Sequence, residues 1–548
     1  MKAKKALAVI LTLAMLVVMA ACSGTPAATN APVATTAAPA STPGASDPAQ
    51  PATEEPEAEL GYPIPGGKTL TYWMGVSVSN WNDNNAKLPL YKMLMEKTGV
   101  TLEFVHPIVG QDTEGFNLMI AGGEYPDLIE SRVMDAGSLF NDGVIIDLTE
   151  VLPQYAPNLW GLLQDNPSID LQVKNDDGQY LLYPFIRPDP LLQISSGPIV
   201  RTDWVEALGM DPDKVDTIAE WEDMLRGFKE EMGAEVPLAF DSADNYRRLM
   251  YAWETSHDFT NENGTVNYGW LREGYRGWLE TMTKWYAEGW LDPNFPSSER
   301  AVLNSNILTG KTGATFGSGG SYLGVWLTGI PEDAPEGYDL GGLRYPTLEE
   351  GAVGHHGDSV QFEFSNSNGW VMISTQCKDV ETAARFLDYG YSEEGIIAYN
   401  FGVEGESFEF VGGEPIYTEA MFNNAEMSIS DTLGHYVRAT GSGPFIQNPG
   451  YIMQYYEADQ QKVALGRWAA QEFKDTKMPP IVHTPEEGTE VTTIMADINT
   501  YIKEEQTKFV TGARSLDTFD DFIATIKSMN IDRAIEIKQN ALNRYYER

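Results

Sequence analysis

The sequence predicts an α/β protein with at least two lobes, and three observations support this prediction. Predicted strands alternate with helices from residue 69 onwards, and strands that are separated by a helix usually pair in parallel within one sheet. The body runs from about residue 61 to residue 548, which is more than one hydrophobic core usually supports. Hydrophobic residues make up 42% of the chain, enough for a packed interior.

The first 22 residues are predicted to be a signal peptide for export. Lys2, Lys4 and Lys5 precede an apolar run at residues 6–18, and small residues lead into Cys22. The run is shorter than the roughly 20 residues that a membrane-spanning helix needs. The sequence Met-Ala-Ala-Cys at residues 19–22 is similar to a bacterial lipobox. We therefore expect a lipid on Cys22 that anchors the protein to the outer face of the cell membrane; ordinary cleavage nearby, leaving a free cysteine, is the alternative.

Residues 23–60 are predicted to be a disordered tether. Ala, Thr, Pro and Ser dominate this segment, and four glutamates follow between residues 54 and 59. Such a composition cannot bury enough apolar surface to fold. The segment would hold the folded body away from the membrane.

Charge and cysteine content exclude several classes of protein. The chain holds 37 Lys and Arg against 79 Asp and Glu, a formal net charge of −42. An acidic surface repels nucleic acid, so we expect no nucleic-acid partner. The chain has two cysteines; if Cys22 carries lipid, Cys377 has no partner, and a disulfide framework is excluded.

Hydrophobic periodicity and turn residues predict the elements of the body in order. At the start we expect a strand at 69–74, a helix at 88–97, a strand at 100–105, a helix at 114–121 and a strand at 128–130. A later helix at 275–289 has Tyr275, Trp278, Met282 and Trp285 on one face. The remaining predictions are a buried strand at 370–374 and helices at 380–389, from 392, at 519–529 and at 532–546.

Several stretches carry a resemblance to a known family. They include Met-Ile-Ala-Gly-Gly-Glu-Tyr-Pro-Asp-Leu-Ile at residues 119–129 and the segments 143–147, 155–158, 177–184, 201–209, 274–295, 310–317 and 511–517. In this order, over most of the body, the chain resembles the extracellular solute-binding proteins of ABC importers. The likeness is to the large lipoprotein members that are associated with oligosaccharides.

The resemblance implies a two-lobe α/β fold, each lobe a mostly parallel sheet flanked by helices, with a ligand cleft between the lobes and a hinge that closes it. We expect residues 66–186 and about 360–395 to form the first lobe. Residues 187–359 and about 396–548 would form the second lobe with the C-terminal helices. The implied function is a receptor that captures a carbohydrate of the oligosaccharide class and delivers it unaltered to the permease subunits. We expect the receptor to be a monomer. Relatives often carry a calcium-loop-like insertion, but residues 229–237 lack it, so we expect no metal and no cofactor.

Candidate ligand-binding residues follow from the chemistry of sugars. A pyranose has an apolar face, which aromatic rings can cover, and a rim of hydroxyls, which paired polar groups can bind. Open α/β sheets bind ligands at the carboxyl ends of their strands. The expected residues are Asn80, Trp81, Asp83, Asn84, Ser131 and Arg132 in the first lobe, Arg201, Trp204, Asp241, Tyr246, Tyr322 and Trp326 in the second lobe, and Asn368 and Trp370 near the return crossing. The alternatives are that Trp204 and Trp326 belong to the core and that Arg201 pairs with Asp203.

Three other functions remain open from the sequence. The first is a receptor for a peptide or another small solute. The second is a secreted glycoside hydrolase or lyase, which requires two carboxyl groups roughly 5–9 Å apart, a distance that sequence spacing cannot show. The third is a surface receptor that feeds a sensor kinase. The resemblance favours a binding protein without enzyme activity.

Overall fold

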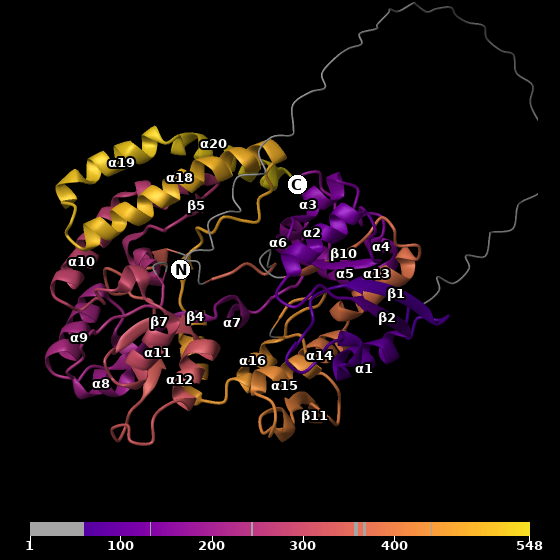
Figure 1. The fold of residues 1–548 in the computed structure, drawn as a ribbon, viewed down its shortest axis with the longest axis horizontal. Coiled ribbons are helices and arrows are strands. Elements are labelled where there is room, and N and C mark those ends of the chain that lie inside the picture. Colours follow the sequence, from indigo (N-terminus) through magenta and orange to yellow (C-terminus); the bar gives the residue numbers. More distant parts are fainter. Residues whose placement is uncertain (1–59, 132, 243–244, 356–359, 365–368, 440) are drawn as a thin grey trace, which may run out of the picture. The chain divides into compact units, whose positions relative to one another are not determined.

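The computed structural model describes residues 60–131, 133–242, 245–355, 360–364, 369–439 and 441–548 (Figure 1). The predicted signal peptide, Cys22 and most of the predicted tether lie outside these residues. Within the described part of the chain, no helix has both the length and the apolar character needed to cross a membrane.

The first sheet has the strand order β10-β3-β1-β2. Strand β1 (Lys68–Trp73) lies parallel to β2 (Val100–Val105) and to β3 (Leu128–Ser131), whereas β10 (Trp370–Ile373) runs antiparallel to β3. In Figure 1 the orange helix α13 (Val380–Asp388) lies among indigo and violet elements, because the chain returns to the first core after it has formed much of the second core. This sheet confirms the mostly parallel arrangement that we expected for the first lobe.

Helix α1 (Pro89–Thr98) illustrates why the predicted helices form. Pro89 lies in the first turn, where its missing N–H removes no helix hydrogen bond. Leu90 and Leu94 are fully buried on one face, and Gly99 ends the helix with a φ of 73°. The other helices of the first lobe are α2 (Asp112–Gly122), α3 (Ala136–Asn141), α4 (Leu152–Tyr155), α5 (Pro157–Asp165), α6 (Pro167–Val173) and α13.

The second sheet differs from the expectation of mostly parallel strands. Its order is β7-β4-β8, and β4 (Ser196–Arg201) runs antiparallel to both β7 (Ala314–Ser318) and β8 (Leu340–Gly342). The segment that leads to Asp241 forms only isolated bridges: Leu238 makes parallel bridges to β7 and to Leu291. Strands β4 and β10 both run antiparallel to the strands they pair with. Each is also the first strand of its sheet that the chain forms after it passes from one core to the other.

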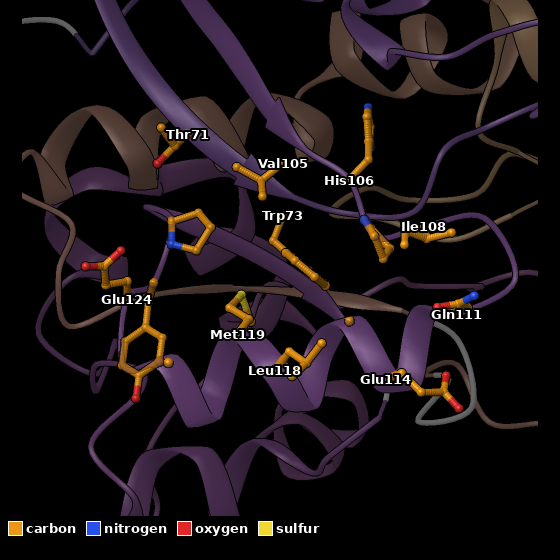
Figure 2. Close-up of a pocket in the computed structure, with 15 residues that line it drawn as sticks. Thr71, Trp73, Val105, His106, Ile108, Gln111, Glu114, Leu118, Met119 and Glu124 are labelled. Atoms are coloured by element: carbon orange, nitrogen blue, oxygen red, sulfur yellow. The ribbon is translucent and has the colours of Figure 1, made fainter.

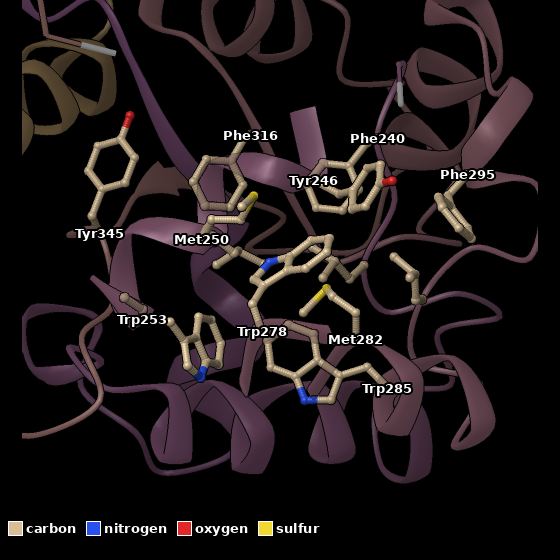
Figure 3. Packing of buried hydrophobic residues seen from close by; sticks show 14 of the residues in the cluster. Phe240, Tyr246, Met250, Trp253, Trp278, Met282, Trp285, Phe295, Phe316 and Tyr345 are labelled. Carbon is tan, nitrogen blue, oxygen red and sulfur yellow. The ribbon is translucent and has the colours of Figure 1, made fainter. Parts of the chain in front are cut away.

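A second hydrophobic core lies around helix α10 (Glu273–Ala287), at the position predicted from the sequence. Figure 3 shows Trp278, Met282 and Trp285 of this helix packed with Tyr246 and Phe295. The further elements of this lobe are α8 (Thr202–Ala207), α9 (Ile218–Glu230), β5 (Phe259–Glu262), β6 (Thr265–Tyr268), α11 (Arg300–Leu308), α12 (Val325–Thr328), β9 (Gly354–His355), α17 (Asp459–Ala469), β13 (Phe473–Lys474), α18 (Pro485–Val510), α19 (Phe519–Ser528) and α20 (Ile531–Glu547). Helix α7 (Pro190–Gln193), just before β4, instead packs through Leu192 in a third, smaller core.

The third, smaller hydrophobic core is formed mainly by residues between Phe401 and Leu465. Its buried residues include Phe401, Leu433 and Tyr456. The elements around it are α14 (Glu393–Phe401), β11 (Phe408–Val411), β12 (Glu414–Tyr417), α15 (Ile429–Tyr436) and α16 (Pro449–Tyr455). The sequence-based division assigned everything after about residue 395 to the second lobe. In the structure the chain first contributes to the first core, as far as Phe445, and joins the second core from Ala464 onward.

Three segments that connect the two large cores lie side by side. The Ile186 amide donates to the Phe445 carbonyl at 3.2 Å, and the Ile186 carbonyl accepts from the Gln447 amide at 2.8 Å. On the other side, the Arg187 amide donates to the Glu363 carbonyl at 2.8 Å. Residues 186–187, 361–364 and 445–447 therefore form a narrow three-segment connection, in line with the two or three crossings that we expected.

Side chains add a fourth connection. Asp176 lies in the turn after α6, which packs in the first core, and it accepts hydrogen bonds from two arginines of the C-terminal segment. The Arg544 Nε donates to Asp176 Oδ2 at 2.8 Å, and the Arg548 Nη2 donates to Asp176 Oδ1 at 2.8 Å. The Arg548 side chain is 0% exposed. The end of α20 is thus attached to the first lobe by ion pairs of low exposure.

Candidate ligand-binding site

A polar cavity of about 800 Å³ lies at the carboxyl ends of β1 and β3. It is formed by the ends of these two parallel strands, the first turn of α2, the residue before β10 and the loop after α15. The lining residues are Trp73, Gly75, Asp112, Thr113, Glu130, Ser131, Val133, Gly369, Gly441 and Ser442. The volume is within the roughly 300–1,000 Å³ of small-molecule sites, and the location is that of ligand sites in open α/β sheets.

Glu130 and Asp112 are the two acidic residues that line this cavity, and the Glu130 side chain is 9% exposed. Its Oε1 accepts from the Arg438 guanidinium at 2.5 Å, and its Oε2 accepts from the Tyr72 hydroxyl at 2.8 Å. Arg438 also donates to the Tyr91 hydroxyl at 2.6 Å. Burial opposes the charge of Arg438, but the adjacent Glu130 carboxylate keeps the Arg438 pKa well above its usual value. Arg438 therefore keeps its positive charge beside Glu130.

A second cavity, of about 690 Å³, shares Trp73 with the first and lies between the sheet and α2. Figure 2 shows Val105, Ile108, Leu118 and Met119 around it, with Glu114 and Glu124 at its edges. Leu118 is 73% exposed. This cavity is an open groove whose exposed lining is mostly apolar; its polar residues are Thr71, His106, Gln111, Glu114, Glu124 and Tyr125.

A polar cluster in the second lobe combines aromatic and charged side chains. Asp241 accepts hydrogen bonds from the Tyr322 hydroxyl and from the Asn245 amide, the latter at 2.5 Å. The Arg300 guanidinium lies 3.2 Å from the centre of the Tyr322 ring and 3.7 Å from Asp241 Oδ2. Burial and the hydrogen bond to Asp241 raise the Tyr322 pKa. The cluster presents a ring, a carboxylate and a guanidinium, the groups that sugar binding requires.

The structure brings together Asp241 and Tyr322, two of the residues predicted for the second lobe. The residues predicted after β1 lie in a separate exposed segment at 80–84. Trp81 is 46% exposed there, Asp83 pairs with Lys87 at 2.5 Å, and the Asn84 side chain caps a short helix by accepting from the Ala86 amide. Asn80, in the same segment, is also exposed.

Other predicted residues are buried in packed surroundings. Arg201 is 2% exposed, forms two hydrogen bonds with Asp203, and lies over the rings of Trp204 and Tyr338, as the alternative for Arg201 and Trp204 anticipated. Tyr246, Trp326 and Trp370 are also buried, at 1%, 0% and 7% exposure. In this structure their rings offer little surface to a ligand.

Two predicted residues, Arg132 and Asn368, lie outside the described residues. Of the predicted residues that the structure describes, Ser131 lines the polar cavity. Sequence reasoning missed Glu130, because it was read as part of the strand, and Arg438 and Ser442, because no local pattern connects them with β3. Asp112 lies before the helix predicted at 114–121, whereas in the structure it is the first residue of α2. Among the described residues, no group of three or more His, Cys, Asp or Glu side chains could hold a metal ion.

Two large α/β cores joined by three neighbouring crossings, with a polar cavity at the strand ends, define the two-lobe class of solute-binding proteins. The chain belongs to the family of bacterial extracellular solute-binding proteins, because the family profile matches residues 90–401.

Individual relatives agree with this assignment. The chain is similar to FusA, a fructooligosaccharide ABC transporter substrate-binding protein of Streptococcus pneumoniae, with 21% identity over 88% of this chain and 92% of FusA. It is 24% identical to the lipoprotein LipO of Bacillus subtilis over 62% of this chain and 68% of LipO. Its fold is similar to that of the alginate-binding protein AlgQ2, with a TM-score of 0.66 and 21% identity over 89% of this chain and 100% of AlgQ2.

Proposed function

We propose that the protein is the receptor of an ABC importer and that it captures an oligosaccharide without altering it. The family match over residues 90–401 supports a solute-binding role. FusA and AlgQ2, which bind carbohydrates according to their names, support this class of ligand. The observation that carries the proposal in this chain is the cavity of about 800 Å³ at the ends of β1 and β3, with hydroxyl and carboxylate groups on its walls.

The proposed mechanism is closure of the two lobes around the sugar. The polar cavity would be one wall of the site, and the cluster of Asp241, Arg300 and Tyr322 would be the other. Contacts from both walls would stabilise the closed form, whose population rises when the sugar binds. The three crossings would act as the hinge. The importer would recognise the closed form of a single copy of the protein.

We also propose a revised division of the chain. The first lobe would contain residues 66–186 and about 360–400, and the second lobe residues 195–350 and about 460–548. Residues 401–456, which include the crossing at 445–447, would form a small subdomain. The distribution of the three hydrophobic cores supports this division. A lipid on Cys22 would anchor the protein to the extracellular face of the membrane; the likeness to the lipoprotein LipO is in line with this.

The test is a titration of the purified protein with kestose, nystose, maltotriose, cellotriose and xylotriose. Tryptophan fluorescence reports binding, and chromatography of the mixture afterwards reports any cleavage. We expect saturable binding of at least one sugar, which is then recovered intact. If the protein binds peptides and not sugars, the proposed class of ligand is wrong. If shorter sugars are released, the protein is a hydrolase and not a receptor.

A further inference from the structure

The position of Glu130 suggests a role beyond the general character of the cavity. Its carboxylate lies at the carboxyl end of β3, in the wall of the polar cavity, with Ser131 and Ser442 beside it. The Ser442 hydroxyl is 3.5 Å from Glu130 Oε1. A Cβ atom at Gly369 would lie 3.0 Å from the Ser442 Oγ and 3.4 Å from Glu130 Oε1. The absence of a side chain at Gly369 therefore leaves this carboxylate and hydroxyl accessible from the cavity.

The hydrogen bonds of Glu130 leave part of its capacity unused. An ionised carboxylate offers about four lone-pair positions and can only accept hydrogen bonds. The Arg438 guanidinium and the Tyr72 hydroxyl occupy one position on each oxygen, and the Ser442 hydroxyl is at the limit of bonding distance. Oε2 can therefore accept a further hydrogen bond, and Oε1 can accept one when the Ser442 hydroxyl, which is 3.5 Å away, turns towards the ligand instead.

The buried ion pair of Glu130 and Arg438 is poorly explained by a contribution to stability alone. Replacing a buried ion pair by apolar residues of similar volume is often neutral or stabilising, and the Glu130 and Arg438 side chains are 9% and 11% exposed. Arg438 lies far along the chain from β3, yet its guanidinium and the Tyr72 hydroxyl hold the carboxylate in one orientation. A fixed acceptor in a cavity wall is the arrangement that binding of adjacent hydroxyls requires.

We propose that Glu130 binds two neighbouring hydroxyl groups of the sugar and that Arg438 is the positioning residue that orients it. This inference rests on the proposed function and names the group that recognises the ligand. The carboxylate accepts one hydrogen bond on each oxygen, and the hydroxyls of Ser131 and Ser442 contact the same face of the sugar. A carboxylate on the ligand at this position is repelled, so the subsite takes a neutral diol.

The test compares Glu130→Gln with a matched control. Glu505 is also paired with an arginine, at 2.6 Å from Arg514, and its side chain is 12% exposed, but it lies on α18 in the second lobe. Glu505→Gln therefore changes a similar ion pair away from the cavity. Isothermal titration is done with kestose, nystose, maltotriose, cellotriose and xylotriose, and thermal unfolding of each variant is measured without sugar.

We expect Glu130→Gln to weaken binding of the best sugar roughly 10–100-fold, the effect of losing a hydrogen bond to a charged acceptor, while Glu505→Gln binds like the wild type. Equal affinity of Glu130→Gln and wild type would overturn the inference and leave the proposed function intact. Failure of the wild type to bind any of the five sugars would instead contradict the proposed function.

Two further variants cover the case in which Glu130→Gln does not fold. Tyr72→Phe removes one hydrogen bond that orients Glu130, and Arg438→Lys keeps the positive charge but loses the planar geometry. We expect both variants to weaken sugar binding several-fold, and galacturonic acid, the anionic control, to give no binding heat with the wild type or with either variant. Unchanged sugar affinity in both variants would contradict the positioning role.

Discussion

The ion pairs between Asp176 and the C-terminal arginines predict how much stability the protein loses when Asp176 is replaced. Asp176 accepts from the Arg544 Nε at 2.8 Å and from the Arg548 Nε and Nη2 at 3.1 and 2.8 Å. Replacing Asp176 by alanine leaves the Arg548 guanidinium buried, with the carbonyls of Leu171 and Pro480 at 3.2 and 3.3 Å as its remaining partners. Arg544 retains Glu487. Removing one partner of a buried pair costs about 3–5 kcal/mol.

Because the Asp176 side chain is still 18% exposed, we expect the lower end of this range, about 3 kcal/mol. The measurement is urea denaturation followed by circular dichroism, together with hydrogen exchange of α20. Glu490→Ala is the control, because Glu490 pairs with Arg533 of the same helix but both side chains are more than 40% exposed. An exposed pair contributes at most about 1 kcal/mol. Equal losses in the two variants would refute the reasoning.

Three further predictions concern the core, the effect of pH and the second wall of the site. Trp278→Ala should lower the free energy of unfolding by about 3–5 kcal/mol, measured by urea denaturation, because the ring is fully buried and its removal leaves a cavity; a loss below 1 kcal/mol would contradict the packing. Burial raises the Asp388 pKa to about 6, above the ordinary 3.8 that it regains on unfolding. The resulting stabilisation is therefore complete below about pH 4 and is lost as the pH rises through 6. Relative to Asp388→Asn, the wild type should lose about 2–3 kcal/mol of stability between pH 4 and 7, and a constant difference would argue against a raised pKa. Tyr322→Phe, which removes the hydroxyl bound to Asp241, should weaken sugar binding several-fold in the titration, and unchanged affinity would remove this cluster from the site.

Local elements could be predicted well from the sequence. The helix around Trp278 and Trp285 was predicted from the spacing of its aromatic residues, and it is confirmed as α10. The strands at 69–74, 100–105 and 128–130 are likewise confirmed as β1, β2 and β3. Burial alternates along β2 and follows the helical period along α10, whereas β1 and β3 have consecutive buried residues; both kinds of pattern are local properties of the chain.

Long-range features could not be predicted in the same way. The direction of β4 depends on the path of the chain between the lobes, which no local pattern records. Arg438 approaches Glu130 across a separation of 308 residues, and neither residue belongs to a motif. Tyr246 was selected because it follows a predicted strand, but it lies on the buried face of a short helix (η3, Asn245–Trp253). Strand ends therefore indicated the region of the polar cavity but, apart from Ser131, not the side chains that line it.

In the proposed closed form, a sugar lies between the polar cavity of the first lobe and the cluster of Asp241, Arg300 and Tyr322 in the second lobe. Crystals of the protein with the tightest-binding sugar of the panel would show where the sugar lies. We expect density for an intact sugar that contacts Glu130 on one side and Tyr322 or Arg300 on the other. Density confined to the apolar groove beside Leu118, or contacts with a single lobe, would contradict this arrangement.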